Sequence, residues 1–159
     1  MSFKQAIISE VDIYPTGNAA SFGGNEANAL PTLTGDTFKT TASVNSVDFE
    51  DGIYSLEFEC LNIQTNKYLA LTLNVESGKT YEVTLFGKRS GTNNAQVIFR
   101  SPFHAAQQII SITETANFGT YTITLLASAT GAAEIRFYPS GDGQVGEKMW
   151  IDGFKIIEQ

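Results

Sequence analysis

Residues 80–88 read TYEVTLFGK, and the apolar side chains at 81, 83 and 85 alternate with the polar side chains at 80, 82 and 84. Successive side chains of a β-strand point to opposite faces of the sheet, so this alternation predicts a strand with one buried face. Gly78 precedes the stretch and permits the tight turn that leads into it. The same alternation recurs at 120–125 and at 134–138. Every second residue of these strands is therefore expected in the core.

Nine segments of the chain are enriched in β-branched and aromatic residues, and turn-forming Gly, Asn, Asp and Ser separate them. The predicted strands are 37–44, 53–60, 68–75, 80–88, 95–100, 107–112, 120–127, 134–138 and 148–157. Short alternating strands with turns about every 8–12 residues are typical of an antiparallel sandwich or barrel. No amphipathic helix of useful length is predicted. The sequence therefore predicts an all-β fold.

Residues 1–36 do not share this periodicity. Residues 4–14 are compatible with one more strand, and residues 15–35 are rich in Gly, Pro, Asn and Ala. A long stretch without its own secondary structure is uncommon inside a compact domain. We therefore expect a strand followed by a long loop along the sandwich edge, or by an arm that orders against a partner.

Length and composition exclude several classes of protein. The 159 residues suit one domain that buries its core without disulfides or metals. The net charge of -7 argues against a nucleic-acid partner, and no apolar run approaches the roughly 18 residues of a membrane helix. The single cysteine, Cys60, lies in a predicted strand and is expected in the core. The lone His104 supports neither a histidine metal cluster nor a Ser-His-Asp triad.

Two patterns typical of enzymes do not fit the predicted strands. Residues 141–146 read GDGQVG, but the dinucleotide-binding motif needs a helix after its glycines, and residues 148–157 predict a strand. Glu57 and Glu59 share one strand face, whereas glycoside hydrolysis needs two carboxyl groups on opposite sides of a cleft. We therefore expect a protein that is not an enzyme.

Five short motifs follow one another along the chain. They are NEANA at 25–29, GIYSL at 52–56, GKTYEVTLFGK at 78–88, IRFY at 135–138 and WIDGF at 150–154. Their order resembles that of the galactose-binding-like jelly-roll carbohydrate-binding modules found beside bacterial glycoside hydrolases. The resemblance implies an antiparallel jelly-roll β-sandwich over 37–159, preceded by the arm at 1–36. It also implies a non-catalytic carbohydrate-binding or adhesion function, although one fold can serve unrelated roles.

The alternation also predicts which side chains face outward. If strands 80–88, 95–100 and 134–138 share one sheet, their outward side chains form one surface with aromatic rings and planar polar groups. Such a surface suits a sugar, whose ring stacks on an aromatic side chain while its hydroxyls take hydrogen bonds. In the resembled modules that face, or the loops at its rim, binds the glycan. The candidate ligand-binding residues are Phe86, Lys88, Gln96, Arg100, Arg136 and Tyr138.

Alternative interpretations of these residues stay open. Residues 15–35 can cover Phe86, and Arg136 and Tyr138 can form an ordinary cross-strand pair with Glu134 nearby. The only tryptophan, Trp150, is expected to pack inside the sandwich.

The resemblance further implies a structural calcium ion. In the resembled modules, oxygens from the first segment, from the turn before the second strand and from an Asp in the last strand hold this ion. The matching residues are Glu26, Asp51 and Asp152, although Gly153 replaces a frequent second acid. Calcium takes about six to eight oxygen ligands, so residues far apart in sequence can form one site.

A second class of function stays open. The same sandwich serves as a virion surface domain, such as a phage capsid or tail decoration protein, which forms homo-oligomers or binds shell proteins. The first ten residues, MSFKQAIISE, lack the apolar core and cleavage site of a signal peptide. We therefore expect an extracellular or virion-surface protein that is made in the cytoplasm and released by lysis.

Overall fold

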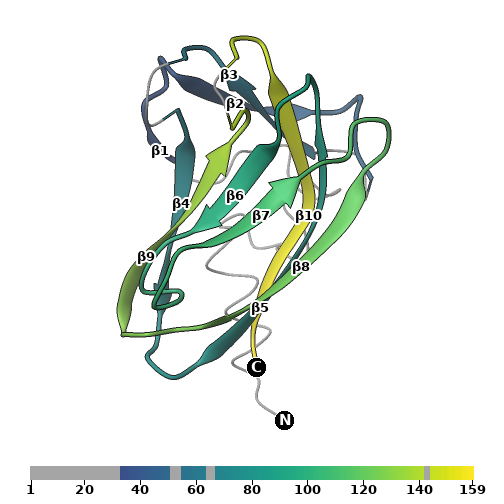
Figure 1. Cartoon of the computed structure of the whole chain (residues 1–159). Helices are drawn as coiled ribbons and strands as arrows, with labels where there is room; N and C mark the ends of the chain where they lie inside the picture. Colours follow the sequence, from purple (N-terminus) through teal and green to yellow (C-terminus); the bar gives the residue numbers. More distant parts are fainter. Residues whose placement is uncertain (1–32, 51–54, 64–66, 142–143) are drawn as a thin grey trace.

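Two antiparallel five-stranded sheets lie face to face (Figure 1). The computed structural model describes residues 33–50, 55–63, 67–141 and 144–159. The first sheet has the order β1-β4-β9-β6-β7, and the second sheet has the order β2-β3-β10-β5-β8. The strands are β1 (Thr34–Gly35), β2 (Thr40–Asn45), β3 (Ser55–Cys60), β4 (Leu69–Val75), β5 (Thr80–Arg89), β6 (Ala95–Phe99), β7 (Gln108–Ile112), β8 (Gly119–Leu126), β9 (Gly131–Tyr138) and β10 (Lys148–Glu158).

The predicted all-β sandwich is confirmed. Each predicted strand from 68 onward matches an observed strand within a few residues at either end. The described residues contain no helix, so none of them forms a helix that could span a membrane. The N-terminal strand and arm predicted for 1–36 fall, apart from residues 33–36, outside the described residues.

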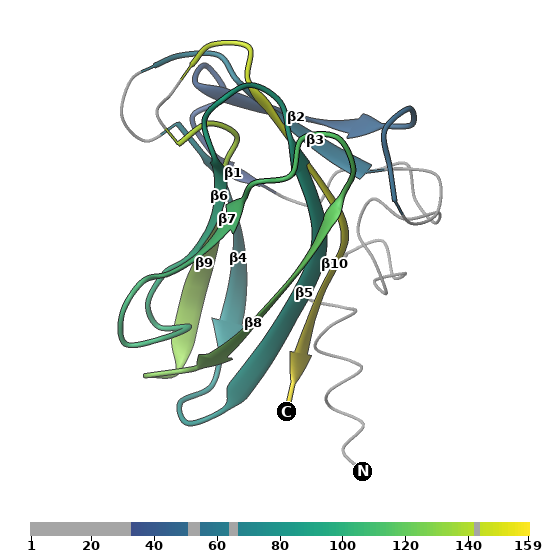
Figure 2. The same ribbon diagram turned by 45° about the vertical axis from the view of Figure 1, so that its right-hand side comes forward.

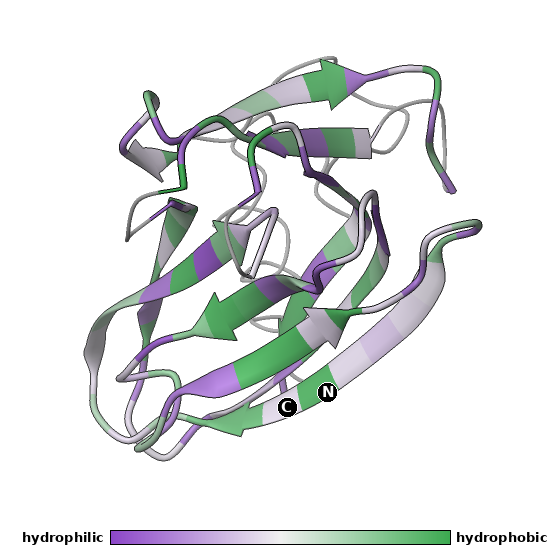
Figure 3. Cartoon of the chain, turned by 45° about the horizontal axis from the view of Figure 1, so that its top comes forward, coloured by the Kyte–Doolittle hydropathy of each residue, from purple (hydrophilic) through white to green (hydrophobic). Residues whose placement is uncertain are grey.

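The core lies between the two sheets, which Figure 2 shows nearly edge-on. Inward side chains follow the predicted alternation, because Tyr81, Val83 and Leu85 of β5 are all buried. Phe58 of the second sheet stacks on Phe137 of the first, with ring centroids 4.8 Å apart. Figure 3 shows the resulting alternation of hydrophilic and hydrophobic bands along the strands. The apolar face of each sheet therefore packs against the other sheet.

The core prediction for Cys60 is confirmed, because its side chain is fully buried. Burial raises the pKa of its thiol. The predicted alternation in β9 also holds, with Ile135 and Phe137 buried.

Strand β10 contains a β-bulge that changes which residues face inward. Its pairing with β5 shifts register between Asp152 and Lys155, and Gly153 has a φ of +53°. A Cβ atom at Gly153 would lie 2.8 Å from Cδ2 of Phe86, so the Phe86 ring covers this glycine from outside. Only glycine gives both this backbone conformation and this close approach without strain.

Candidate functional site

The outer face of the first sheet carries four of the predicted ligand-binding residues. Strand alternation turns Arg136 and Tyr138 of β9 outward, beside their buried neighbours. Gln96 of β6 pairs with Tyr138, so it faces the same side. Arg100 follows β6, and its backbone N–H donates to the carbonyl oxygen of Glu134 at 2.9 Å. These residues therefore lie on one surface, as predicted. We call Tyr68, Gln96, Arg100, Glu134, Arg136 and Tyr138 the tyrosine face.

Two tyrosine rings form the aromatic part of this face. The ring centroids of Tyr68 and Tyr138 are 5.0 Å apart, with the planes inclined by 44°. The guanidinium carbon of Arg136 lies 4.4 Å from the Tyr68 centroid, which is cation–π geometry. Both tyrosines are half-buried, so part of each ring is open to solvent. Tyr68 was not among the predicted site residues.

The polar groups of the face hold one another in place. The Nε of Arg136 donates to Oε2 of Glu134 at 2.7 Å. Burial acts to lower the pKa of Arg136, but hydrogen bonds to Glu134 and Tyr138 and the Glu134 charge raise it above its usual value. For Tyr138, burial raises the pKa, and the hydrogen bond from Arg136 opposes that shift only in part. At neutral pH the face therefore presents a charged guanidinium and a neutral phenol.

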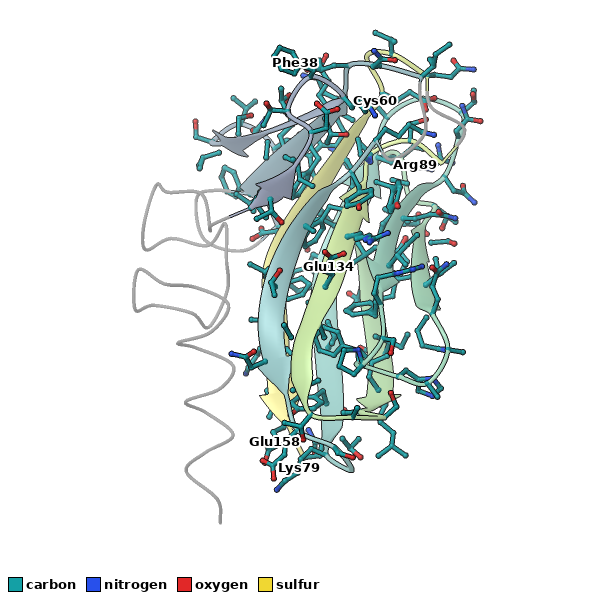
Figure 4. The ribbon with its side chains drawn as sticks, turned by 90° about the vertical axis from the view of Figure 1, so that its left-hand side faces the viewer. Phe38, Cys60, Lys79, Arg89, Glu134 and Glu158 are labelled. Atoms are coloured by element: carbon teal, nitrogen blue, oxygen red, sulfur yellow. The ribbon has the colours of Figure 1, made fainter. Side chains whose placement is uncertain are left out.

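Arg100 lies at the edge of the tyrosine face and is exposed. Its Nη1 donates to the amide oxygen of Gln107 in the segment between β6 and β7. The charge of Arg100 is close enough to the phenol of Tyr138 to act on the pKa of that group. Figure 4 labels the neighbouring Glu134 about midway along the sandwich, between the Lys79–Glu158 ion pair at one end and Phe38 and Cys60 at the other.

The prediction of one surface for all six residues is wrong, because β5 belongs to the second sheet. Phe86 and Lys88 therefore lie on the opposite outer face of the sandwich from the tyrosine face. Both carboxylate oxygens of Asp48 accept hydrogen bonds from the Lys88 ammonium. That ammonium also lies 5.0 Å from the Trp150 ring centroid and 5.4 Å from the Phe118 centroid. The charge of Lys88 is thus engaged within the protein.

The expectation that Trp150 packs inside is also wrong. Met149 and Ile151 fill the core, so Trp150 between them faces outward and is half-buried. Its Nε1 donates to Oε2 of Glu57 at 2.8 Å, and Lys148 donates to the other oxygen of Glu57 at 2.7 Å. Burial acts to raise the pKa of Glu57, but hydrogen bonds from Lys148, Asn45 and Trp150 lower it below its usual value. The polar groups on this side of the sandwich bind one another.

The predicted calcium site falls only in part on described residues. Asp152 is fully buried, and its Oδ1 and Oδ2 accept the backbone N–H groups of Gly153 and Glu50 at 2.7 and 2.8 Å. Glu26 and Asp51 lie outside the described residues. Within the described residues, no three His, Cys, Asp or Glu side chains gather as metal ligands would. A buried carboxylate beside the bulge suits the proposed ion, and the calcium site stays a prediction.

No protein-family model matches this sequence, and no curated protein matches it significantly. Solved structures do match in fold. The xylan-binding domain CBM22-1 of Paenibacillus barcinonensis Xyn10C has 14% identity and a TM-score of 0.63, over 87% of this chain and 92% of that domain. The module TmCBM61, solved with β-1,4-galactotriose, has 16% identity and a TM-score of 0.57, over 96% of this chain and 98% of the module.

A phage protein shares the same fold. The enzymatically active domain of bacteriophage CBA120 tailspike protein 4 has 15% identity and a TM-score of 0.60, over 96% of this chain. This chain spans only 22% of that tailspike structure, whereas it spans nearly all of the two modules. In its fold, the chain is a jelly-roll β-sandwich similar to carbohydrate-binding modules.

Proposed function

We propose that this protein is a non-catalytic carbohydrate-binding module that binds a glycan on the tyrosine face. The observation that carries the proposal is the pair of half-exposed rings, Tyr68 and Tyr138, set among polar side chains on one open sheet face. The structural neighbours support it, since one is described as xylan-binding and another was solved with galactotriose.

The chemistry of the face suits a sugar. A pyranose ring has an apolar face that stacks on an aromatic ring, and the inclined rings of Tyr68 and Tyr138 offer two such planes. The hydroxyl groups around the ring need donors and acceptors in the plane of the sugar. Gln96 supplies an amide, Glu134 a carboxylate and Arg136 a guanidinium. Because Arg136 is already fixed by Glu134 and Tyr68, little conformational entropy is lost when the glycan binds.

A binding role without catalysis fits the same residues. The only described carboxylate of the tyrosine face, Glu134, is held in an ion pair with Arg136. Glycoside hydrolysis would need a second carboxyl group about 5–10 Å away across a cleft. The neighbours that this chain spans almost fully are binding modules, which supports the same conclusion.

The experiment is a glycan array on the full chain, followed by calorimetry of each hit with Tyr138→Ala. We expect the substitution to weaken binding about tenfold, since stacking on an aromatic ring adds roughly 0.5–1.5 kcal/mol to the free energy of burying that ring. The matched control is Phe86→Ala, which removes an aromatic ring from the opposite face and is expected to leave affinity unchanged. Loss of binding in the control with retention in Tyr138→Ala would move the site to the second sheet. No binding to any glycan would refute the proposal.

The similarity to a tailspike domain supports a second proposed role, as a surface domain of a virion that attaches to a glycan or to shell proteins. Under this role the protein would act outside the cell or on the virion surface, as part of a homo-oligomer or a larger assembly. Size-exclusion chromatography with light scattering separates the two roles. A monomer favours the isolated module, and a stable trimer or other oligomer favours the virion role.

A further inference from the structure

We propose that the glycan bound on the tyrosine face carries an acidic sugar, a uronate, and that its carboxylate pairs with Arg100. This inference rests on the proposed glycan-binding function and names the class of glycan. The observation behind it is a difference between the two arginines of the face.

Arg136 has a carboxylate partner, and Arg100 has none among the described residues. The Nε of Arg136 is 2.7 Å from Oε2 of Glu134, so the positive charge of Arg136 is already paired with a carboxylate. The side chain of Arg100 instead donates to the neutral amide oxygen of Gln107 and takes part in no described ion pair. A guanidinium held by an amide is fixed in position while it keeps its full positive charge. Arg100 is also exposed, so an incoming ligand can reach it.

The charge of the face is opposite to that of the chain. The described tyrosine face has two arginines and one glutamate, whereas the whole chain has a net charge of -7. The other outward residues of the first sheet, such as Thr72, Asn74 and Ser111, are uncharged. A protein with this net negative charge repels polyanions over most of its surface. The positive charge of Arg100, which has no carboxylate partner among the described residues, therefore favours an anion at this position of the face.

The chemistry of arginine favours a carboxylate as that anion. Its planar guanidinium stays protonated and can donate two parallel hydrogen bonds to a carboxylate. Arg100 lies opposite Glu134 on the neighbouring strand. Tyr138 lies four residues beyond Glu134 along β9, so at about 3.4 Å per residue the backbones of Arg100 and Tyr138 are about 14 Å apart. That distance exceeds the width of one sugar ring. This spacing leaves room for the uronate and the sugar stacked on the tyrosines to be different units of one oligosaccharide.

The test compares acidic polysaccharides with their own carboxyl-reduced forms, which keep the linkages and ring configurations and lose the charge. The probes are polygalacturonate, alginate and glucuronoxylan with their reduced products, and calorimetry measures their binding to the full chain. We expect the wild type to bind at least one acidic polymer about tenfold or more tightly than its reduced form. Arg100→Gln should bind both forms equally well. Lys155→Gln is the matched control, because it removes one positive charge from the outer face of the second sheet and should keep the preference.

The failure of this inference differs from the failure of the proposed function. Equal binding of acidic and reduced polymers by the wild type overturns the inference and leaves glycan binding intact. A preference for the acidic form that survives Arg100→Gln also overturns it, because another cation would then hold the carboxylate. If no acidic or neutral glycan binds at all, the proposed function fails and the inference fails with it. Circular dichroism melting curves confirm that each variant is folded.

Discussion

Replacing Gly153 by alanine tests the geometry of the β10 bulge. The new Cβ atom would meet Cδ2 and Cε2 of Phe86 at 2.8 and 2.9 Å, and the backbone at this position has a φ of +53°. The left-handed conformation costs a residue with a Cβ about 1–2 kcal/mol. Displacing the Phe86 ring adds about 1–3 kcal/mol, as overpacking commonly does. We therefore expect Gly153→Ala to lower the free energy of unfolding by about 2–5 kcal/mol.

Two further variants separate these contributions. Gly78→Ala is the control for the backbone alone, because Gly78 has a φ of +80° and a Cβ atom added there would have no neighbour within 4 Å. It should cost only the conformational part, about 1–2 kcal/mol. In the double variant Phe86→Ala with Gly153→Ala the ring is gone, so the combined loss should be smaller than the sum of the two single losses by about 1–3 kcal/mol.

Urea denaturation followed by tryptophan fluorescence and circular dichroism measures the wild type and each variant, with a common slope showing that only stability has changed. The reasoning is refuted if Gly153→Ala loses no more stability than Gly78→Ala. It is also refuted if the two single losses add fully in the double variant. Either result would mean that the Phe86 ring does not lie over the bulge, and Phe86 would again be a candidate for ligand binding.

Three other predictions concern Glu57, Tyr68 and the calcium site. Glu57→Gln should lower stability at neutral pH by about 1–3 kcal/mol, since it removes the ion pair with Lys148. The pKa of Glu57 is lowered in the folded state, so the ionised carboxylate stabilises the fold above its usual pKa, and this stabilisation is lost as the pH falls through the folded pKa. The free energy of unfolding should therefore fall more for the wild type than for Glu57→Gln between neutral pH and about pH 3. Equal falls would contradict this prediction. Tyr68→Ala should weaken glycan binding about as much as Tyr138→Ala in calorimetry, and an unchanged affinity would remove Tyr68 from the site. EDTA should lower the melting temperature if a calcium ion is bound, and an unchanged melting temperature would dismiss the ion proposed at Glu26, Asp51 and Asp152.

The strands could be predicted from the sequence because the two-residue alternation is a local property. Tyr81, Val83 and Leu85 face the core as predicted, and the same rule identifies Tyr68. Residue 68 shares its parity with the outward Thr72 and Asn74 of β4, so the alternation already turned Tyr68 outward. That signal was present in the sequence and was missed.

The division of strands between sheets could not be predicted, since alternation separates inside from outside and does not say which sheet a strand joins. Phe86 and Tyr138 are both outward, yet β5 and β9 lie in different sheets and their side chains point in opposite directions. The bulge in β10 is a second limit. Met149 and Ile151 are buried before it and Phe154 and Ile156 after it, so the inward parity changes within one strand.

The place of β10 in the second sheet affects how the protein can be made. This strand comes last of the ten described, yet it lies between β3 and β5 and pairs with both. While a ribosome is still adding residues 148–158, β3 and β5 have no partner on that side. Two strands with unpaired backbone groups on one side are then exposed to other nascent chains. The second sheet can close only after this stretch has left the exit tunnel, so truncation before it should give aggregates rather than a smaller domain.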